Sequence, residues 1–223
     1  MLSLPNLKEF SRRIVEWYRK FGSHHLPWRN VKSPWGVLVA SFLLRKTTVK
    51  QVERVYEEFM RRYPDPEAVC RADEGEIKEL LTPLGMEHRR SRLIKELAEE
   101  VVEKFGGEIP LSREELKKLP GVGDYISSEV LLVASGMPEP LLDRNMIRVI
   151  ERVFGVKSSK PRPHTDRNLW SFARTLVPRN PEEAKAFNYG VLDFARDICQ
   201  ARKPRCGACF LADICIYYKK RGS

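Results

Sequence analysis

The chain has 223 residues, 42% of them hydrophobic and 31% charged, which indicates a folded globular protein and excludes a disordered or fibrous one. Its 40 Lys and Arg residues outnumber its 30 Asp and Glu residues, so it carries a net charge of +10. This excess favours a polyanionic partner, nucleic acid before membrane, although a basic surface that is only solvated gives the same charge.

The longest apolar run, residues 35–44, is shorter than the roughly 18 residues that a membrane span needs. No charged leader followed by an apolar segment opens the chain. We therefore expect a cytoplasmic protein with no membrane partner. Gln is rare beside Lys, Arg and Glu, a bias compatible with a thermophilic source.

Apolar residues recur at helical spacing along most of the chain, and the alternation typical of strands is nearly absent. In the first half this pattern predicts helices near residues 7–21, 35–44, 49–62, 74–82 and 93–105. The second of these is apolar enough to be buried, and two glycines, Gly106 and Gly107, end the last one.

In the second half, Ser112 and Glu115 form a predicted capping box for a short helix that stops at Pro120. Further helices are expected at 124–135, after Asp143, at 169–176, and from 180 to 199. The fold class is therefore all-α, and we expect two helical lobes with a cleft between them, where sites commonly lie. We assign residues 26–136, with a hairpin at 119–124, to one lobe and residues 1–25 plus 137–223 to the other.

Four of the five cysteines crowd into the last 25 residues, with the spacing C-x6-C-x2-C-x5-C. They are Cys199, Cys206, Cys209 and Cys215. Four thiolates this close together can surround one zinc ion or one iron–sulfur cluster. Structural zinc sites commonly use two C-x-x-C pairs and this segment has one, which favours a [4Fe–4S] cluster. Three cations in the first loop, Arg202, Lys203 and Arg205, are candidate phosphate contacts.

The stretch "LPGVGDYISS" places two glycines directly before a helix. Gly121 and Gly123, with Val122 between them, would leave backbone N–H groups uncovered at the helix N-terminus, a geometry suited to an anionic oxygen. Asp143 follows twenty residues after Gly123, behind the apolar "PLL". Locally it reads as a helix N-cap, and it can also be a carboxylate that faces a developing positive charge.

These segments together resemble the helix-hairpin-helix DNA glycosylases. "LPGVGDYISSEVLLVASGMPEPLLDRNMIRVIERVFGV" is similar to their hairpin and following aspartate, and the terminal cysteines resemble the [4Fe–4S] loop of the endonuclease III and MutY branch. "LPWR", "LLRKTT" and "FNYGVLDFARDIC" look like that branch as well, so the resemblance covers nearly the whole chain. The resemblance implies a monomeric, nucleoid-associated DNA repair enzyme with a DNA-binding cleft, which acts on double-stranded DNA that contains a mismatched or damaged base.

Two residues separate the members of this family. Where bifunctional endonuclease III enzymes have a lysine that forms a Schiff base, this chain has Tyr125, which implies a monofunctional hydrolase and resembles the thermophilic G·T mismatch glycosylases. Adenine glycosylases carry a glutamate where this chain has Ser41, and serine cannot protonate adenine. Ser41 therefore favours a pyrimidine substrate, although the mismatch glycosylases tend to keep that glutamate. Only eight residues follow Cys215, which also argues against an adenine glycosylase.

The resemblance further implies roles in DNA recognition. Arg45 and Lys46 match residues that fill the vacated base stack, and Met86 resembles the wedge that enters from the opposite side. Asn145 would position the Asp143 carboxylate or a water molecule. Their alternatives are solvated cations for the first two, a core methionine, and helix packing for the asparagine.

The function expected is excision of thymine or uracil mispaired with guanine, by hydrolysis of the N-glycosidic bond to leave an abasic site. An adenine (A·G mismatch) or oxidised-base glycosylase is the alternative of the same class. A DNA-binding module without catalysis is the alternative of another class.

Overall fold

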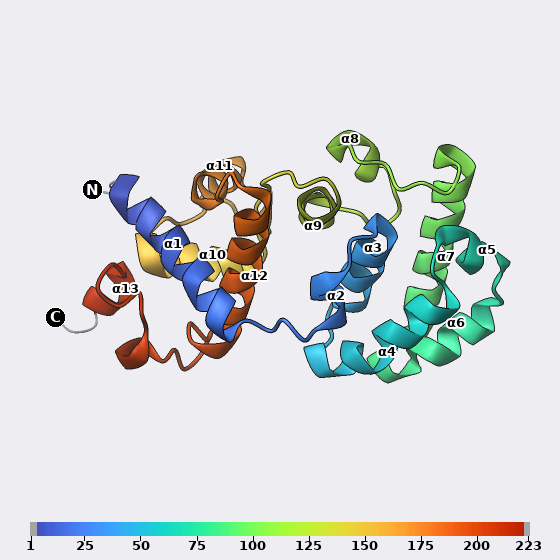
Figure 1. Ribbon diagram of the computed structural model, residues 1–223, viewed down its shortest axis with the longest axis horizontal. Coiled ribbons are helices and arrows are strands. Elements are labelled where there is room, and N and C mark those ends of the chain that lie inside the picture. The colour runs from blue at the N-terminus through green and yellow to red at the C-terminus, as the bar shows by residue number, and fades with distance from the viewer. Residues whose placement is uncertain (1–3, 221–223) are drawn as a thin grey trace. The chain divides into compact units, whose positions relative to one another are not determined.

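The computed structural model describes residues 4–220, and this range contains helices, turns and loops but no β-strand (Figure 1). The predicted all-α class is confirmed. No helix within it is long and apolar enough to cross a membrane. The chain divides into two compact units. We call His24–Ser135 the central unit, and Met1–Ser23 together with Gly136–Ser223 the terminal unit.

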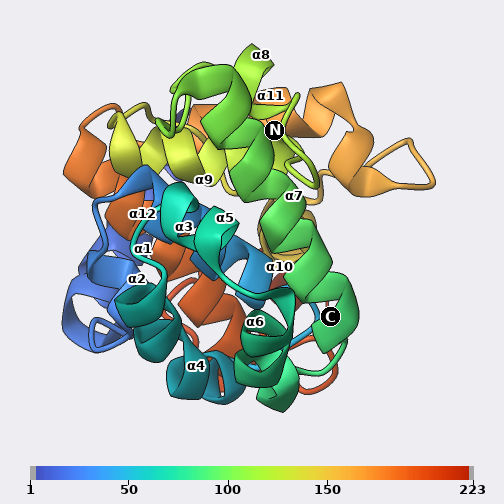
Figure 2. The same ribbon diagram turned by 90° about the vertical axis from the view of Figure 1, so that its right-hand side faces the viewer.

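The central unit is built around one buried helix, α3 (Pro34–Leu43), on which α2, α4, α7 and α9 pack. The other elements of this unit are α2 (Pro27–Asn30), α4 (Val49–Arg62), α5 (Pro66–Arg71), α6 (Glu74–Leu81), the 3₁₀ helix η1 (Thr82–Leu84), α7 (Glu87–Phe105), α8 (Arg113–Leu116) and α9 (Asp124–Ala134). The long helix α7 runs along α5 and α6 (Figure 2).

The sequence explains why α3 lies at the centre. Ser33 caps the helix by accepting the Gly36 N–H at 3.4 Å, and Pro34 occupies the first turn, where a missing N–H costs nothing. Every residue from Trp35 to Leu43 is buried. The indole N–H of Trp35 donates to the Tyr63 carbonyl at 3.1 Å, so its polar atom is satisfied inside the core.

The terminal unit combines the two ends of the chain. Its elements are α1 (Leu4–Phe21), α10 (Arg144–Phe154), η2 (Pro163–Thr165), α11 (Arg167–Leu176), α12 (Pro181–Asp197), η3 (Cys206–Ala208) and α13 (Ile216–Lys219). Helix α12 packs against both α1 and α10, and α13 packs against α10 (Figure 1). Through these contacts the first helix of the chain supports the cysteine-rich segment at its end.

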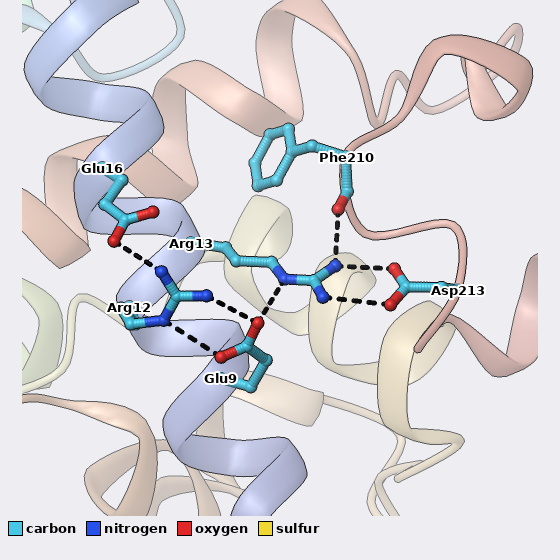
Figure 3. Close-up of polar contacts among 6 residues, drawn as sticks. All are labelled: Glu9, Arg12, Arg13, Glu16, Phe210 and Asp213. Atoms are coloured by element: carbon cyan, nitrogen blue, oxygen red, sulfur yellow. Dashed lines mark hydrogen bonds and ion pairs between the residues drawn. The ribbon is translucent and has the colours of Figure 1, made fainter.

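Helix α1 is fastened to the cysteine-rich segment by one arginine (Figure 3). Arg13 donates to the Phe210 carbonyl at 2.9 Å and forms a two-pronged ion pair with Asp213 at 2.6 and 3.0 Å. The Phe210 ring stacks on Trp17 of α1, with ring centroids 5.9 Å apart and planes 16° apart. The residues that follow Cys209 are therefore held by both a charge-assisted and an aromatic contact.

Candidate functional site

A tight hairpin joins α8 to α9 in the central unit. The Val122 N–H donates to the Leu119 carbonyl at 3.1 Å, and Gly121 has a φ of 72°, in the left-handed region that glycine adopts without strain. A Cβ atom at Gly121 would also lie 2.9 Å from Cε1 of Phe42. The backbone conformation and the packing of the core both require glycine at this position.

The second hairpin glycine, Gly123, is not required in this way. Its φ of −110° is open to any residue, and a Cβ atom there would meet no described heavy atom within 4 Å. Gly123 is exposed and immediately precedes α9, whose first N–H groups lack a helical partner. The side chain of Val122 is buried, so the hairpin presents its backbone to the outside at Gly123 and its side chain to the core at Val122.

Asp143 caps α10 in the terminal unit. Its Oδ1 accepts the backbone N–H groups of Asn145 and Met146, both at 2.8 Å, and its Oδ2 accepts from Nδ2 of Asn145 at 2.6 Å. Burial raises the pKa of the Asp143 carboxyl, and these three hydrogen bonds oppose the rise. The predicted N-cap is confirmed, and Asn145 holds the second oxygen of the carboxylate in a fixed direction.

Helix α10 also carries two arginines that hold the cysteine-rich segment. Arg148 donates to the carbonyls of Ala195 and Cys199, both at 3.0 Å. Arg152 donates to the Gln200 carbonyl at 2.7 Å and to Sγ of Cys199 at 3.5 Å. The aspartate at one end of α10 and the cysteines beside its other turns are thus positioned by the same helix.

The four terminal cysteines line one hollow in the terminal unit. They are Cys199, Cys206, Cys209 and Cys215. Burial, and to a smaller extent the neighbouring cysteines, raises the pKa of Cys209 to about 11, so a thiolate there requires compensating positive charge. Four thiols around one hollow, with an arginine N–H aimed at one sulfur, fit an iron–sulfur cluster.

The first loop of the cysteine-rich segment carries its cations on the outside. Arg202, Lys203 and Arg205 are all exposed. The loop is anchored by the Arg205 N–H, which donates to the Ile198 carbonyl at 2.9 Å. Its three cations are therefore presented to solvent on a backbone that is held at both ends.

The two family-discriminating residues lie in the central unit. Tyr125 is half-buried in the first turn of α9 and packs against the core of the unit. Ser41 is buried on α3, where its single hydroxyl hydrogen is shared between the Val37 carbonyl at 2.9 Å and Oε2 of Glu129 at 2.7 Å. Glu129 belongs to α9 and is itself buried. The serine at position 41 is therefore accompanied by a carboxylate from the neighbouring helix.

Two residues of the central unit, Lys46 and Met86, share an unusual backbone. Both have a φ of 55°, and within residues 4–220 they are the non-glycine residues with a left-handed conformation. Both also line a single hollow of about 250 Å³. Such strain is retained in a fold where surrounding contacts enforce it, and it is often found at functional sites.

A buried arginine enforces those two turns. Arg90 donates to the carbonyls of Phe42 at 2.8 Å, Arg45 at 2.6 Å and Gly85 at 2.9 Å, which lie in the segments before Lys46 and Met86. Arg45 lies over the Phe42 ring, 4.7 Å from its centroid, and donates to the Gly121 carbonyl of the hairpin. Arg45 is thus part of the scaffold of the hairpin as well as a lining residue of the hollow.

Sequence reasoning missed three residues of this arrangement: Arg90, Arg152 and Glu129. Nothing in the local sequence distinguishes Arg90 or Arg152 from the many other arginines. Glu129 left a signal, because it is the single ionisable residue in the run "ISSEVLLVA" of an otherwise buried helix. A charge in such a run indicates either a misassigned helix face or a functional carboxylate.

Comparison with known proteins decides the family. Residues 39–175 match the model of the HhH-GPD superfamily base excision DNA repair proteins. The chain belongs to this superfamily. Residues 199–215 match the iron–sulfur binding domain of endonuclease III, so the chain contains an iron–sulfur binding domain at the four cysteines. The predicted superfamily and the predicted iron–sulfur cofactor are confirmed.

Individual relatives extend over almost the entire chain. A thymine-DNA glycosylase of Aeropyrum pernix is 62% identical over 97% of this chain and 97% of its own length. A thymine/uracil-DNA glycosylase of Pyrobaculum aerophilum is 62% identical over 96% of this chain and 93% of its own. The solved structure of a thermostable thymine-DNA glycosylase, at 33% identity, superposes with a TM-score of 0.90 and covers 97% of this chain and 98% of that one.

Proposed function

We propose that this chain of the HhH-GPD superfamily is a monofunctional DNA glycosylase that removes thymine or uracil mispaired with guanine and leaves an abasic site. The observation that carries the proposal is the 62% identity, over nearly the full length of both chains, to a thymine-DNA and a thymine/uracil-DNA glycosylase. The identity and geometry of Asp143, Tyr125 and the hairpin support the same chemistry.

In the proposed reaction the bond between C1′ of the sugar and N1 of the base breaks, and its electron pair leaves with the base. The sugar becomes cationic, and the Asp143 carboxylate stabilises that charge. A water molecule then adds its oxygen to C1′ and transfers its proton to Asp143. The two backbone N–H groups and the Asn145 amide keep the carboxylate fixed, so little reorganisation is needed as the charge develops.

Tyr125 supports the monofunctional assignment. A phenol cannot form the imine through which an amine nucleophile would cleave the strand. Tyr125 is half-buried at the start of α9, one residue after the end of the hairpin. We assign it to the pocket of the flipped base, where its ring would contact that base. Flipping costs less for a mispaired base, which contributes to selectivity.

DNA binding would use the backbone of the hairpin and the outer loop. Gly123 leaves space for a phosphate oxygen to approach the unpaired N–H groups of α9, because no described atom of the protein occupies that space. The exposed Arg202, Lys203 and Arg205 would contact further phosphates. Together with the net charge of +10, these contacts predict affinity that falls steeply with salt.

The two left-handed turns, at Lys46 and Met86, would face the gap that the flipped base leaves in the duplex. Lys46 and Met86 share one hollow with Arg45, and their left-handed backbone is held by Arg90. We assign Met86, which is 43% exposed, as the apolar wedge, and Arg45 and Lys46 as contacts to the orphaned guanine, whose O6 and N7 accept hydrogen bonds.

We assign the four cysteines of segment 199–215 as the ligands of a [4Fe–4S] cluster. When bound, this group supplies a cross-link between the end of α12 and the chain terminus, and the reaction itself requires no electron transfer. Arg152 and Arg148 hold the same segment from α10. The cluster would thereby hold the loop with Arg202, Lys203 and Arg205 in a fixed position relative to α10, the helix that Asp143 caps.

The test is a panel of duplexes with thymine or uracil opposite guanine, adenine opposite guanine, an oxidised base, and a normal C·G pair. Each is incubated with the protein and then resolved with and without alkali. We expect alkali-dependent strand breaks with the thymine and uracil mismatches alone. Strand breaks in the duplex with adenine or with the oxidised base would show that this base, and not thymine or uracil, is the substrate. Binding to every duplex without any release would identify a DNA-binding module.

A further inference from the structure

One buried carboxylate of the central unit has no role in the reaction described above. Glu129 is 7% exposed and lies on α9 among buried apolar residues, where α9 packs against α3. A carboxylate buried among apolar side chains costs several kcal/mol relative to water unless it is well satisfied, and an apolar residue of similar size is usually as stable or more so. Glu129 therefore needs polar partners in this core helix, and the Ser41 hydroxyl is one of them.

The surroundings of Glu129 keep it oriented. The buried Ser41 hydroxyl donates to its Oε2 at 2.7 Å, a short hydrogen bond to one of its two oxygens. The charge of Glu129 also reaches Tyr56 on α4: burial chiefly raises the pKa of Tyr56, to about 12, and Glu129 adds to the rise. The Tyr56 hydroxyl itself donates to the Gly36 carbonyl at 3.1 Å. The carboxylate thus lies where α3, α4 and α9 meet.

Glu129 also shares a helix face with the proposed base-pocket residue. Tyr125 and Glu129 are four residues apart on α9, so their side chains lie on the same face, one turn apart. Tyr125 is nearer the hairpin and half-buried, whereas Glu129 is deeper. A base that contacts Tyr125 and enters further along this face would meet the carboxylate next.

We propose that Glu129 is the base-recognition residue of this enzyme: its carboxylate accepts the N3–H of a flipped thymine or uracil, while Ser41 holds it in place. This inference rests on the proposed function and specifies how the same pocket selects its base. Ser41 is then a positioning residue, because it acts on the base only through Glu129.

The chemistry of the bases explains the value of such a contact. Thymine and uracil carry an N–H donor at N3, whereas cytosine carries a lone pair there. A carboxylate aimed at N3 pairs with the first two and repels the third. An enzyme that excises pyrimidines opposite guanine must not excise cytosine from the normal C·G pair, and a buried acceptor provides that discrimination.

The experiment compares Glu129→Met, Glu129→Gln and Ser41→Ala with the wild type on two substrates, under single-turnover conditions. One duplex carries uracil opposite guanine, and the other carries 3-deazauracil, in which C–H replaces the N3–H. The rate constant of each variant is divided by that of the wild type on the same duplex. The difference in stability between the two glycosidic bonds therefore cancels. Ser128→Ala is the matched control, since Ser128 is buried on α9 beside Glu129 and bonds Arg113 instead.

We expect Glu129→Met to slow uracil release about 10- to 200-fold, and 3-deazauracil release by less than about 3-fold. Ser41→Ala should show the same pattern with a smaller loss, and Ser128→Ala should change neither rate. The methionine variant should melt below the wild-type temperature, because it leaves the polar partners of the buried carboxylate unpaired. Glu129→Gln, which keeps the shape of the side chain, guards against a folding defect in the methionine variant.

Equal losses on both bases, or none on either, would overturn the inference and assign Glu129 a structural role. In both cases a wild type that releases uracil opposite guanine would leave the proposed function intact. A wild type that releases no uracil would instead overturn the proposed function, and the role of Glu129 with it.

Discussion

Asp143 has two roles that different substitutions separate. It caps α10 through two N–H groups at 2.8 Å, and in the proposed reaction it faces the cationic sugar. Asp143→Asn keeps an acceptor oxygen for the cap but removes the charge. Asp143→Ala removes both. Asparagine and aspartate cap helices about equally well, whereas alanine costs about 1 kcal/mol of the free energy of unfolding.

The loss of rate follows from the missing charge. A carboxylate about 4 Å from a cationic carbon, at an effective dielectric constant of about 20, contributes about 4 kcal/mol, which corresponds to roughly 1,000-fold in rate. We therefore expect both variants to release uracil about 1,000-fold more slowly than the wild type. The free energy of unfolding of Asp143→Asn should lie within about 0.5 kcal/mol of the wild-type value. That of Asp143→Ala should be about 1 kcal/mol lower than the wild-type value.

The assay is single-turnover uracil release with alkali detection, beside fluorescence anisotropy for DNA binding and denaturant unfolding for stability. Binding should be retained in both variants. Asp143 would not be the catalytic carboxylate if Asp143→Asn released uracil at the wild-type rate, or if its loss of rate were matched by an equal loss of DNA binding.

Five further outcomes are expected. Burial raises the pKa of Asp143, so the rate of wild-type base release should fall at low pH, with a midpoint above the ordinary pKa of 3.8. The rate of the Asp143→Asn variant should not show this fall. By linkage, the same shift favours folding at low pH, and that contribution is lost as pH rises through the folded-state pKa. Gly121→Ala should lower the free energy of unfolding by about 1–2 kcal/mol, because it forces a Cβ into a left-handed residue against Phe42. Gly123→Ala should change stability by less than about 0.5 kcal/mol yet weaken DNA binding several-fold, as anisotropy would show, because its Cβ meets only the space proposed for a phosphate. Tyr125→Lys should gain alkali-independent strand nicking and become trapped on DNA by borohydride, since an amine can form the imine. Arg152→Met should lose the visible absorbance of its cluster to an iron chelator at least about 10-fold faster, because contacts to Cys199 and its neighbours disappear.

Local patterns in the sequence were enough to place most helices. The predicted helix at 49–62 is α4 with the same bounds, and α7 ends at Phe105, directly before the predicted glycine cap at Gly106, which is left-handed. Helix α7 begins earlier than predicted, at Glu87, because its first turns are polar and lack the apolar spacing. The short helices α2 and α5 were missed, since one or two turns carry no recognisable period.

Capping chemistry was predicted less well than helix position. Ser112 caps α8 by accepting the Glu115 N–H, but the glutamate carboxylate accepts from the serine hydroxyl at 2.7 Å. The reciprocal capping box is formed instead by Thr48 and Gln51 at the start of α4. Both pairs have residue types that permit the motif, and side-chain rotamers decide between them.

The site itself depended on contacts that no local pattern contains. The cap at Asp143 could be predicted because its partners are two and three residues away. The Ser41–Glu129 hydrogen bond joins residues 88 positions apart, and the Arg90 bonds to Phe42 and Arg45 span more than 40 positions, so they follow from how α3, α7 and α9 pack. Ser41 alone indicated a missing carboxylate, whereas the fold supplies one from another helix.

The most direct test of the account identifies the product. The wild-type protein is incubated with duplexes that carry thymine or uracil opposite guanine, and the released material is separated by chromatography while the DNA strand is examined without alkali. The account predicts free thymine or uracil, an intact strand that breaks only after alkali, and no base released from a C·G pair. Adenine as the released base, no free base at all, or a strand already cut before alkali would contradict it.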